Sequence, residues 1–330
     1  MVVAERATID GTPTPSFLVT DDIYEGDARN LLKAVEPDSV ALSFWSPPYF
    51  VGKSYERHLT FDDWQALLKE VVALHFDVIK PGGFLAINIA DILAFPDETM
   101  PRIQADNVSS KRSSITREQV LTAVDAYPEY SRYQLAELLG CSEQTIQRRL
   151  EHNNVRGGKY ALQTNVQLVG GFVDEWATAA GFYIYDRRIW VKDPCWENGR
   201  WHSLSYRSVD ESEYIYILWK PGITKVDRRR LTRQEWSEWG SRGVWDIPSV
   251  RNHDVHEAEF PLELPRRVIR LLSEPGDTVL DCFVGVGTTA VAAIQEHRQY
   301  LGFELNPDYV SKARHRCTAQ RFQALTGNDA

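Results

Sequence analysis

Residues 39–49 read SVALSFWSPPY, and this stretch organises the interpretation of the whole chain. The apolar run predicts a buried strand, and the two prolines end it because proline donates no backbone hydrogen bond and fixes φ. The chain must therefore turn stiffly at Ser46-Pro47-Pro48-Tyr49, with a hydroxyl and an aromatic ring at the turn. Such a corner suits the crevice where open α/β sheets bind ligands, although a plain proline-rich turn is an equal alternative.

The composition is that of a soluble globular protein. The chain has 330 residues, 43% of them hydrophobic and 25% charged, which suggests about two domains. Its formal net charge is −9, so any contact with nucleic acid would need a local basic patch. The four cysteines form no CxxC pair or zinc spacing, which predicts a reduced cytoplasmic protein without a structural metal. No apolar run is long enough for a membrane span.

The hydrophobic periodicity alternates between strand and helix, which predicts an α/β fold. Strands are expected near 21–26, 39–45, 84–89, 182–191, 214–219, 278–281 and 300–304, and helices at 28–35, 61–80, 166–180, 264–272, 288–296 and from 309 onward. Pro81-Gly82-Gly83 should stop the helix at 61–80. A polar linker at 95–118 interrupts the pattern, and three short helices follow at 116–127, 131–139 and 143–152.

A second motif, DCFVGVGT at residues 281–288, joins a predicted strand to a predicted helix. Its two glycines allow a tight turn and a close approach to a ligand. Glu304 ends the next strand about 20 residues later, where a carboxylate can accept hydrogen bonds from both hydroxyls of a ribose. No lysine follows Gly287, which argues against a P-loop. By itself the turn fits a nicotinamide cofactor, S-adenosylmethionine or a purely structural connection.

Together these motifs resemble those of DNA amino-methyltransferases. Ser46-Pro47-Pro48-Tyr49 is similar to their catalytic motif, and Asp281 to Gly287 is similar to their S-adenosylmethionine loop, D-P-F-x-G-S-G-T-T. The catalytic motif comes first, as in the circularly permuted β-type enzymes. Supporting matches in the same order are Glu25-Gly26-Asp27, Pro81-Gly82-Gly83-Phe84, His256 to Pro261 and Gly276 to Asp281. The resemblance covers about two thirds of the chain. Cys282 and Val286 depart from the family's usual proline and small residue.

The resemblance implies a Rossmann-like, S-adenosylmethionine-dependent methyltransferase fold. It would be circularly permuted, with a helix-turn-helix-like insert and a small target-recognition region. The expected division is 1–112 for the catalytic part of the core, 113–160 for the insert, 161–220 for more core, 221–255 for target recognition and 256–330 for the cofactor-binding part.

The resemblance also implies a chemistry for the catalytic motif. An exocyclic amino nitrogen is a poor nucleophile because its lone pair is delocalised into the ring. The Ser46 hydroxyl and the Pro47 carbonyl would accept hydrogen bonds from its two N–H groups, with the carbonyl held in place by the locked proline. Alternatively, the hydroxyl would donate to the ring nitrogen. Tyr49 would stack on the base, which must be flipped out of the duplex. The methyl group would then move directly to nitrogen, without a metal or covalent intermediate.

The cofactor would be S-adenosyl-L-methionine. The matching positions are Asp27, Phe260, Pro261, Asp281, Phe283, Gly285, Gly287, Thr288 and Glu304. Glu304 would hold the ribose, although a strand-end surface acid is the alternative. Asp27 would accept from the adenine amino group, or would only cap the helix that follows.

The serine form of the catalytic motif goes mainly with cytosine-N4 enzymes in the family, and the aspartate or asparagine form goes mainly with adenine. Cytosine N4 is therefore favoured over adenine N6. The expected partners are double-stranded DNA and a cognate restriction endonuclease that forms no stable complex, without membrane or metal. The expected location is the cytoplasm, at the nucleoid.

Two segments are candidates for DNA binding. Residues 131–152 resemble a helix-turn-helix, with Gln144, Thr145, Gln147 and Arg148 facing outward on the second helix. A helical insert that only packs or dimerises is the alternative. Arg228, Arg229, Arg230 and Arg233 form a local basic patch where the family usually places target recognition. Two other functions stay open, a DNA-binding regulator with an inactive core and a methyltransferase acting on RNA or a small molecule.

Overall fold

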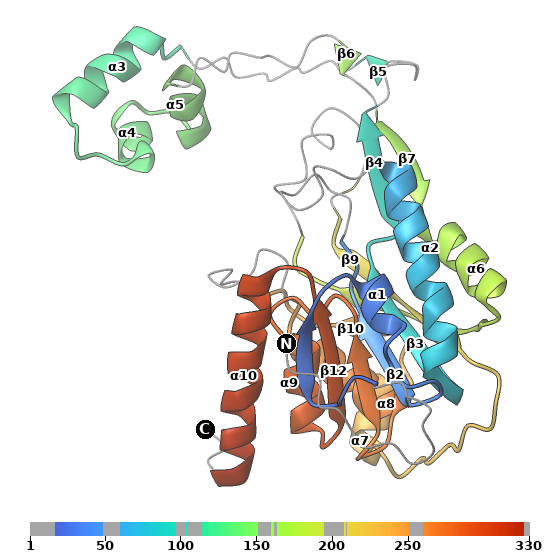
Figure 1. Ribbon diagram of the computed structural model, residues 1–330. Helices are drawn as coiled ribbons and strands as arrows, with labels where there is room; N and C mark the ends of the chain where they lie inside the picture. The colour runs from blue at the N-terminus through green and yellow to red at the C-terminus, as the bar shows by residue number, and fades with distance from the viewer. Residues whose placement is uncertain are drawn as a thin grey trace. The chain divides into compact units, whose positions relative to one another are not determined.

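The computed structural model describes residues 17–48, 60–96, 103–104, 114–150, 160–161, 164–194, 208, 210–250 and 260–326 (Figure 1). The chain divides into two compact units. One comprises residues 1–94, 166–194 and 210–330, and the other comprises residues 95–165 and 195–209.

The first unit is built on an eight-stranded sheet with the order β1-β12-β11-β2-β3-β9-β8-β10. The strands are β1 (Asp22–Glu25), β12 (Gln299–Glu304), β11 (Thr278–Asp281), β2 (Val40–Trp45), β3 (Ile79–Ile89), β9 (Ser212–Trp219), β8 (Tyr183–Val191) and β10 (Val244–Asp246). The first five are parallel, and β9 is antiparallel to both β3 and β8. The predicted α/β fold is confirmed.

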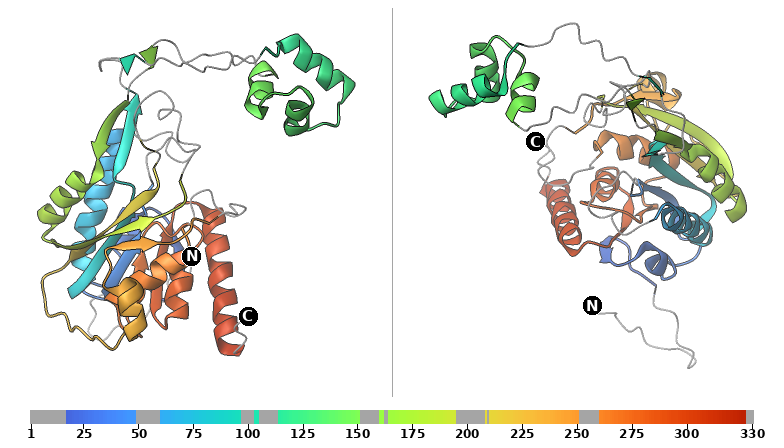
Figure 2. Two further views of the ribbon diagram at one scale, coloured as in Figure 1. Left: turned by 180° about the vertical axis from the view of Figure 1, so that it is seen from behind. Right: turned by 90° about the horizontal axis from the view of Figure 1, so that it is seen from above.

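Helices cover both faces of this sheet (Figure 2). One layer holds α1 (Ala28–Leu32), α2 (Phe61–Val78) and α6 (Val169–Ala180), and the other holds α8 (Glu263–Leu272), α9 (Thr288–Gln295) and α10 (Pro307–Thr326). The chain leaves β11 in one direction along the sheet and β2 in the other, so a topological switch point lies between these neighbours. Open α/β sheets bind ligands at such points, beyond the carboxyl ends of the strands.

The local sequence explains why these elements form. Thr60 and Asp63 make a reciprocal capping box that begins α2, and an apolar stripe that includes Trp64, Leu68 and Val72 buries its inner face. Burial of each such side chain stabilises the fold by roughly 2 kcal/mol. All six residues of β2 are buried, as expected for a parallel strand between two helical layers.

Two predicted boundaries are wrong. Residues 166–168 lie in strand β7 (Thr164–Leu168), which pairs with β4 (Ile92–Pro96), and α6 begins only at Val169. The cap of α6 comes from another segment, because the carbonyl and carboxylate of Asp91 accept the N–H groups of Val169 and Gly170. A local pattern cannot reveal this cap. Residues 81–83 also lie inside β3, at an irregularity in its pairing with β2.

Residues 221–250 belong to the first unit. They contain α7 (Arg233–Glu235), a π-helical turn (Trp236–Gly240) and the edge strand β10. Trp239 and Trp245 are buried in the main core. The predicted target-recognition region is thus continuous with the sheet over its described residues.

In the second unit, α3 (Arg117–Ala126), α4 (Arg132–Leu138) and α5 (Glu143–Leu150) pack around a small core of Val120, Ala123, Leu135, Ala136 and Ile146. Gly140 turns the chain between α4 and α5 with a left-handed φ of 62°. A two-stranded sheet of β5 (Ile103–Gln104) and β6 (Tyr160–Ala161) also lies in this unit. The three helices form close to their predicted ranges, with Ala136 and Ile146 in their shared core on either side of the Gly140 turn.

A fully buried histidine connects α2 to the centre of the sheet. His75 Nδ1 lies 2.7 Å from the Val71 carbonyl oxygen, and its Nε2 lies 2.9 Å from the hydroxyl of Ser43 in β2. That hydroxyl is also 3.0 Å from the Leu280 carbonyl oxygen in β11. Burial lowers the pKa of His75 from 6.5 to about 4, so the ring is neutral in the folded protein.

We expect His75 to make the fold acid-sensitive. Between pH 6.5 and 4, His75 is mostly protonated in the unfolded chain and mostly neutral in the folded protein. Its contribution to the free energy of unfolding therefore falls as the pH falls through this range. The contribution of His75 to the loss of stability from pH 8 to pH 5 should be about 2 kcal/mol. It is measured by urea unfolding as the difference between the wild type and His75→Gln, because the raised pKa of Asp281 acts in the opposite sense over the same range. The exposed His315→Gln should leave the wild-type profile unchanged. An equal acid response in His75→Gln and the wild type would contradict the assignment.

Candidate active site

The polar residues predicted for the site meet at the carboxyl ends of neighbouring strands. Ser46 follows β2, Asp281 ends β11 and Glu304 ends β12. Asp27 follows β1, whose last residue, Glu25, pairs with Glu304. Parallel pairing brings these positions, widely separated in sequence, to one edge of the sheet.

The glycine turn after β11 has the conformation that its sequence predicts. Gly285 and Gly287 have φ values of 53° and 90°, in the left-handed region that favours glycine. The Gly285 N–H donates to Glu304 Oε2 at 2.9 Å, and the Asn306 N–H donates to Oε1 at 2.9 Å. Glu304 is therefore bound to the glycine turn and is not a free surface acid.

Asp281 is a buried carboxyl group beneath this turn. Burial raises its pKa to about 7, and the nearby Glu304 adds to the rise, while the Thr289 hydroxyl and the Phe283 N–H oppose it. Burial also raises the pKa of Glu304. Two carboxyl groups that are costly to ionise side by side fit a cationic ligand, which would favour their charged forms.

Asp27 caps α1, which was the alternative to a cofactor contact. Its Oδ1 accepts the N–H of Arg29 at 2.8 Å, and its Oδ2 accepts from the Arg29 guanidinium at 2.6 Å. The hydrogen bond with the Arg29 side chain is the main reason that its pKa is lowered.

The corner at Ser46-Pro47-Pro48 is fixed from two sides. The Ser46 hydroxyl donates to the Asn88 carbonyl oxygen at 2.9 Å, and Trp64 Nε1 donates to the Pro48 carbonyl oxygen at 2.7 Å. Pro47 is buried between them. Tyr49 lies outside the described residues.

An aromatic contact joins this corner to the glycine turn. The ring of Trp45, which precedes Ser46, meets the ring of Phe283 edge to face at 5.4 Å between centroids. Phe260 likewise packs on Phe44 of β2 at 5.7 Å between ring centroids, and Pro261 follows it in the sequence.

The remaining predicted cofactor positions are described only in part. Residues 256–259 lie outside the described residues. At the start of α9, the Thr288 hydroxyl accepts a long hydrogen bond of 3.4 Å from Arg316.

The structure adds three residues that the sequence analysis did not select. Asn88 Nδ2 donates to Ser46 Oγ at 2.8 Å and to Glu213 Oε2 at 2.7 Å, and Glu213 is ion-paired with Lys192. Asn88 and Glu213 are buried. The sequence feature that could have indicated Asn88 is its position as a polar residue near the end of the apolar run that forms β3.

The two predicted DNA-binding segments lie in different units. In the second unit Arg148 is exposed on α5, and Thr145 and Gln147 are partly exposed. Gln144 lies on the same helix. Arg149 instead donates to the Ile115 carbonyl and holds α5 against the start of α3.

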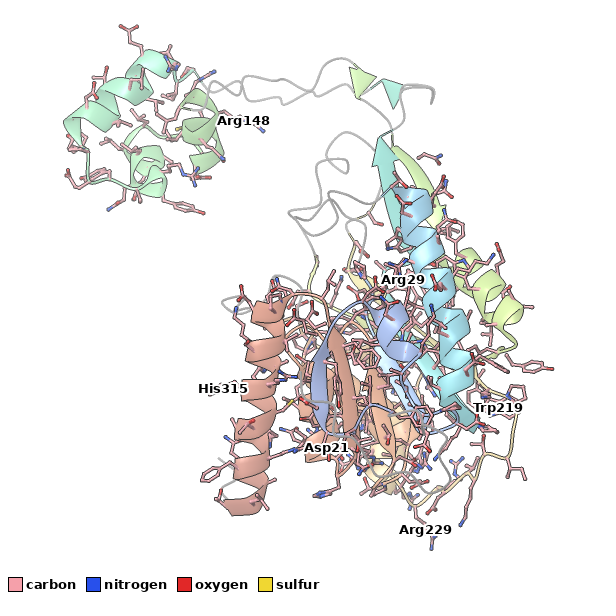
Figure 3. The ribbon with its side chains drawn as sticks, viewed as in Figure 1. Asp21, Arg29, Arg148, Trp219, Arg229 and His315 are labelled. Carbon is pink, nitrogen blue, oxygen red and sulfur yellow. The ribbon has the colours of Figure 1, made fainter. Side chains whose placement is uncertain are left out.

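In the first unit Arg229 lies near the amino ends of the strands (Figure 3). Arg230 lines a cavity there with Ala41 of β2, whereas Ser46 follows the carboxyl end of β2. Arg229 is paired with Asp227, and Arg228 lies over the Trp236 ring at 4.8 Å. Arg230 donates to the Leu271 carbonyl and pairs with Glu274, and Arg233 is exposed. The structure does not bring this patch to the Ser46 edge.

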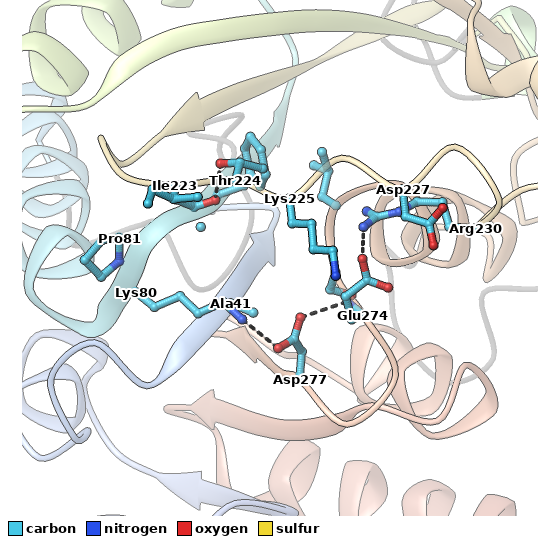
Figure 4. Close-up of a pocket in the computed structure, with 15 residues that line it drawn as sticks. Ala41, Lys80, Pro81, Ile223, Thr224, Lys225, Asp227, Arg230, Glu274 and Asp277 are labelled. Atoms are coloured by element: carbon cyan, nitrogen blue, oxygen red, sulfur yellow. Dashed lines mark hydrogen bonds and ion pairs between the residues drawn. The ribbon is translucent and has the colours of Figure 1, made fainter.

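A cavity of about 330 Å³ also lies at the amino ends of β2, β3 and β11 (Figure 4). Two ion pairs lie in its walls, Lys80 with Asp277 at 2.7 Å and Arg230 with Glu274. None of the predicted catalytic or cofactor residues lines it, so it is separate from the candidate site.

Within the described ranges, no cluster of three or more His, Cys, Asp or Glu side chains could hold a metal ion. None of the helices described there is both long and apolar enough to cross a membrane.

Comparison with known proteins identifies the family. The N6/N4 methylase family, described as DNA methylase, matches residues 40–315. The chain is 57% identical over 295 residues to the type II methyltransferase M.BglI of Bacillus subtilis, covering 89% of this chain and 85% of M.BglI. It is 36% identical to M.Cfr9I of Citrobacter freundii over 303 residues, covering 89% and 86%.

Solved structures agree on the fold. TTHA0409 of Thermus thermophilus, provisionally assigned as a DNA modification methylase and solved with S-adenosyl-L-methionine, has a TM-score of 0.58 at 26% identity and covers 91% of this chain and 93% of its own. The cytosine-N4-specific PvuII DNA methyltransferase has a TM-score of 0.55 at 18% identity, covering 94% and 95%. The match to the family covers most of the sequence and includes both strands of the switch point. The chain therefore belongs to the N6/N4 family of DNA methylases.

Proposed function

We propose that the protein transfers a methyl group from S-adenosyl-L-methionine to N4 of a cytosine in duplex DNA, as the modification enzyme of a type II restriction-modification system. The observation that carries the proposal is the position of Ser46 beside the glycine turn, joined through the Trp45–Phe283 contact. The identity of 57% with the type II methyltransferase M.BglI supports methyl transfer and the type II setting.

The residues at the glycine turn fit this cofactor. S-adenosyl-L-methionine supplies a methyl group on a positively charged sulfur and carries a cationic amino group. Asp281 and Glu304 would favour a cation in the site, and Glu304 would accept from the ribose hydroxyls. Phe283, Gly285 and Gly287 would line the methionine and adenosyl parts, with Phe260, Pro261 and Thr288 at the margin. Asp27 would accept from adenine in addition to capping α1.

The protein's part in the chemistry is to hold the amino group of the base. The Ser46 oxygen and the Pro47 carbonyl would accept its two N–H bonds, which draws electron density back onto the nitrogen. Tyr49 would stack on the flipped base. Serine at position 46 favours cytosine, and adenine N6 is the alternative product.

Nucleoside analysis tests the reaction and the base together. Recombinant protein, S-adenosyl-L-methionine and unmethylated genomic DNA amplified in vitro should yield N4-methylcytosine by mass spectrometry. Ser46→Ala should lower the rate roughly 10²- to 10³-fold because a preorganised group at the reacting atom is lost. Ser39→Ala, at the other end of β2, is the matched control and should keep full activity. N6-methyladenine would change the assigned base, and a fully active Ser46→Ala would remove Ser46 from catalysis.

The buried Asp281 should make cofactor binding depend on pH. Its pKa is about 7 in the free protein, so at pH 6 most molecules hold a proton that a cationic ligand must displace. Calorimetric affinity for S-adenosyl-L-methionine should therefore rise about tenfold from pH 6.0 to 7.5. Asp281→Asn should bind more weakly and without this slope, and Glu304→Gln should retain it. A slope that persists in Asp281→Asn would assign the titration to another group.

We also propose that α5 contacts DNA. Arg148→Ala should lower the slope of log K against log salt by about one unit, since one phosphate contact is lost. Fluorescence anisotropy with a labelled duplex at several salt concentrations measures it, with Lys69→Ala of α2 as the control. Arg229→Ala in the same assay tests the second predicted patch. An unchanged slope in Arg148→Ala would contradict the role of α5.

A further inference from the structure

The Ser46 hydroxyl is the last member of a series of hydrogen-bonded polar side chains that begins at the ion pair between Lys192 and Glu213. Lys192, just after β8, is paired with Glu213 on β9, and Glu213 accepts from the Asn88 amide on β3 at 2.7 Å. The same amide donates to Ser46 Oγ at 2.8 Å. Side chains from three neighbouring strands thus lead to one catalytic oxygen.

The charge at one end determines the direction of every hydrogen bond along this series. A carboxylate only accepts, so the atom of Asn88 that faces Glu213 must be its NH₂ group. The second hydrogen of this group points to the Ser46 oxygen, which therefore accepts it. The single hydroxyl hydrogen of Ser46 is donated to the Asn88 backbone carbonyl at 2.9 Å.

We propose that Asn88 is a positioning residue, oriented by the Glu213–Lys192 pair, that makes Ser46 purely a hydrogen-bond acceptor toward the target base. The inference rests on the proposed function. Because the serine hydrogen is already committed, Ser46 does not donate to the ring nitrogen. Ser46 and the Pro47 carbonyl then form a pair of acceptors that suits an amino group.

This arrangement also acts as a filter. Two acceptors are complementary to the N–H groups of cytosine or adenine, whereas the carbonyl oxygen of thymine or uracil in the same place would leave acceptors facing each other. The arrangement would disfavour a base with a carbonyl oxygen in the place of the amino group, without a residue that contacts the rest of the ring.

A double-mutant cycle between Asn88 and Ser46 tests the proposal. Single-turnover methyl transfer to unmethylated genomic DNA is measured for the wild type, Asn88→Ala, Ser46→Ala and the double variant. Asn88→Ala should lower the rate about tenfold in the wild-type background and less than twofold in the Ser46→Ala background, because it acts through Ser46. Ser43→Ala, a buried serine of β2 bonded elsewhere, is the control and should have the same effect in both backgrounds.

A second set of variants keeps the test valid if Asn88→Ala folds poorly. Glu213→Gln removes the charge that orients the amide and should lower the rate about tenfold, with cofactor affinity unchanged. Adding Lys192→Met removes the cation that Glu213 balanced, so the thermal midpoint should recover while the rate stays low. A purely structural role predicts that rate and midpoint recover together.

The outcomes separate the two proposals. No methyl transfer by the wild type, or full activity in Ser46→Ala, would overturn the proposed function. A slow Ser46→Ala combined with an unaffected Asn88→Ala, or with equal losses in both backgrounds, would overturn only the role of Asn88. Recovery of the rate in the double variant Lys192→Met/Glu213→Gln would show that the Glu213–Lys192 ion pair does not act by orienting Asn88.

Discussion

The parallel pairing of β11 with β2 is the constraint on which the rest of the structure depends. It sets Leu280 beside Ser43 and joins segments more than 230 residues apart. Helices leave the two strands on opposite faces, which makes this junction the topological switch point of the sheet. The Ser43 hydroxyl lies within hydrogen-bond distance of both β11 and His75, which ties the junction to α2. The glycine turn follows β11 and the corner at Ser46-Pro47-Pro48 follows β2. The two lie side by side because β11 and β2 are paired neighbours.

Much of this could be predicted from the sequence, because it depends on local patterns. The apolar run before Ser46, the glycines of the turn and the capping residue Asp27 each act within a few positions of the chain. Contacts between residues far apart in the sequence could not be predicted from local patterns. Asn88 meets Glu213 only because β3 and β9 are antiparallel neighbours, and Asp91 caps α6 across an insertion of about 70 residues.

Residues 221–250 show the same limit in another form. Their arginines and tryptophans have the composition of a DNA-contacting patch, but composition does not show which edge of a sheet a segment joins. In the structure β10 pairs with β8, Trp239 and Trp245 enter the core, and Arg230 spans to the carboxyl end of α8. Arginines that are clustered in the sequence can thus be used mainly for hydrogen bonds and ion pairs within the protein, as Arg229 and Arg230 are here.

The two sides of the switch point use charge in opposite ways. At the glycine turn, burial disfavours ionisation of the Asp281 and Glu304 carboxyl groups, so in our proposal their charge is reserved for a cationic ligand. At the corner that carries Ser46, Glu213 is already paired with Lys192, so in our proposal its charge orients neutral groups. A chain of neutral hydrogen bonds can transmit that orientation to Ser46 without placing a charge beside the base. This suits a reaction in which the amino nitrogen must gain electron density while the site binds a cationic methyl donor next to it.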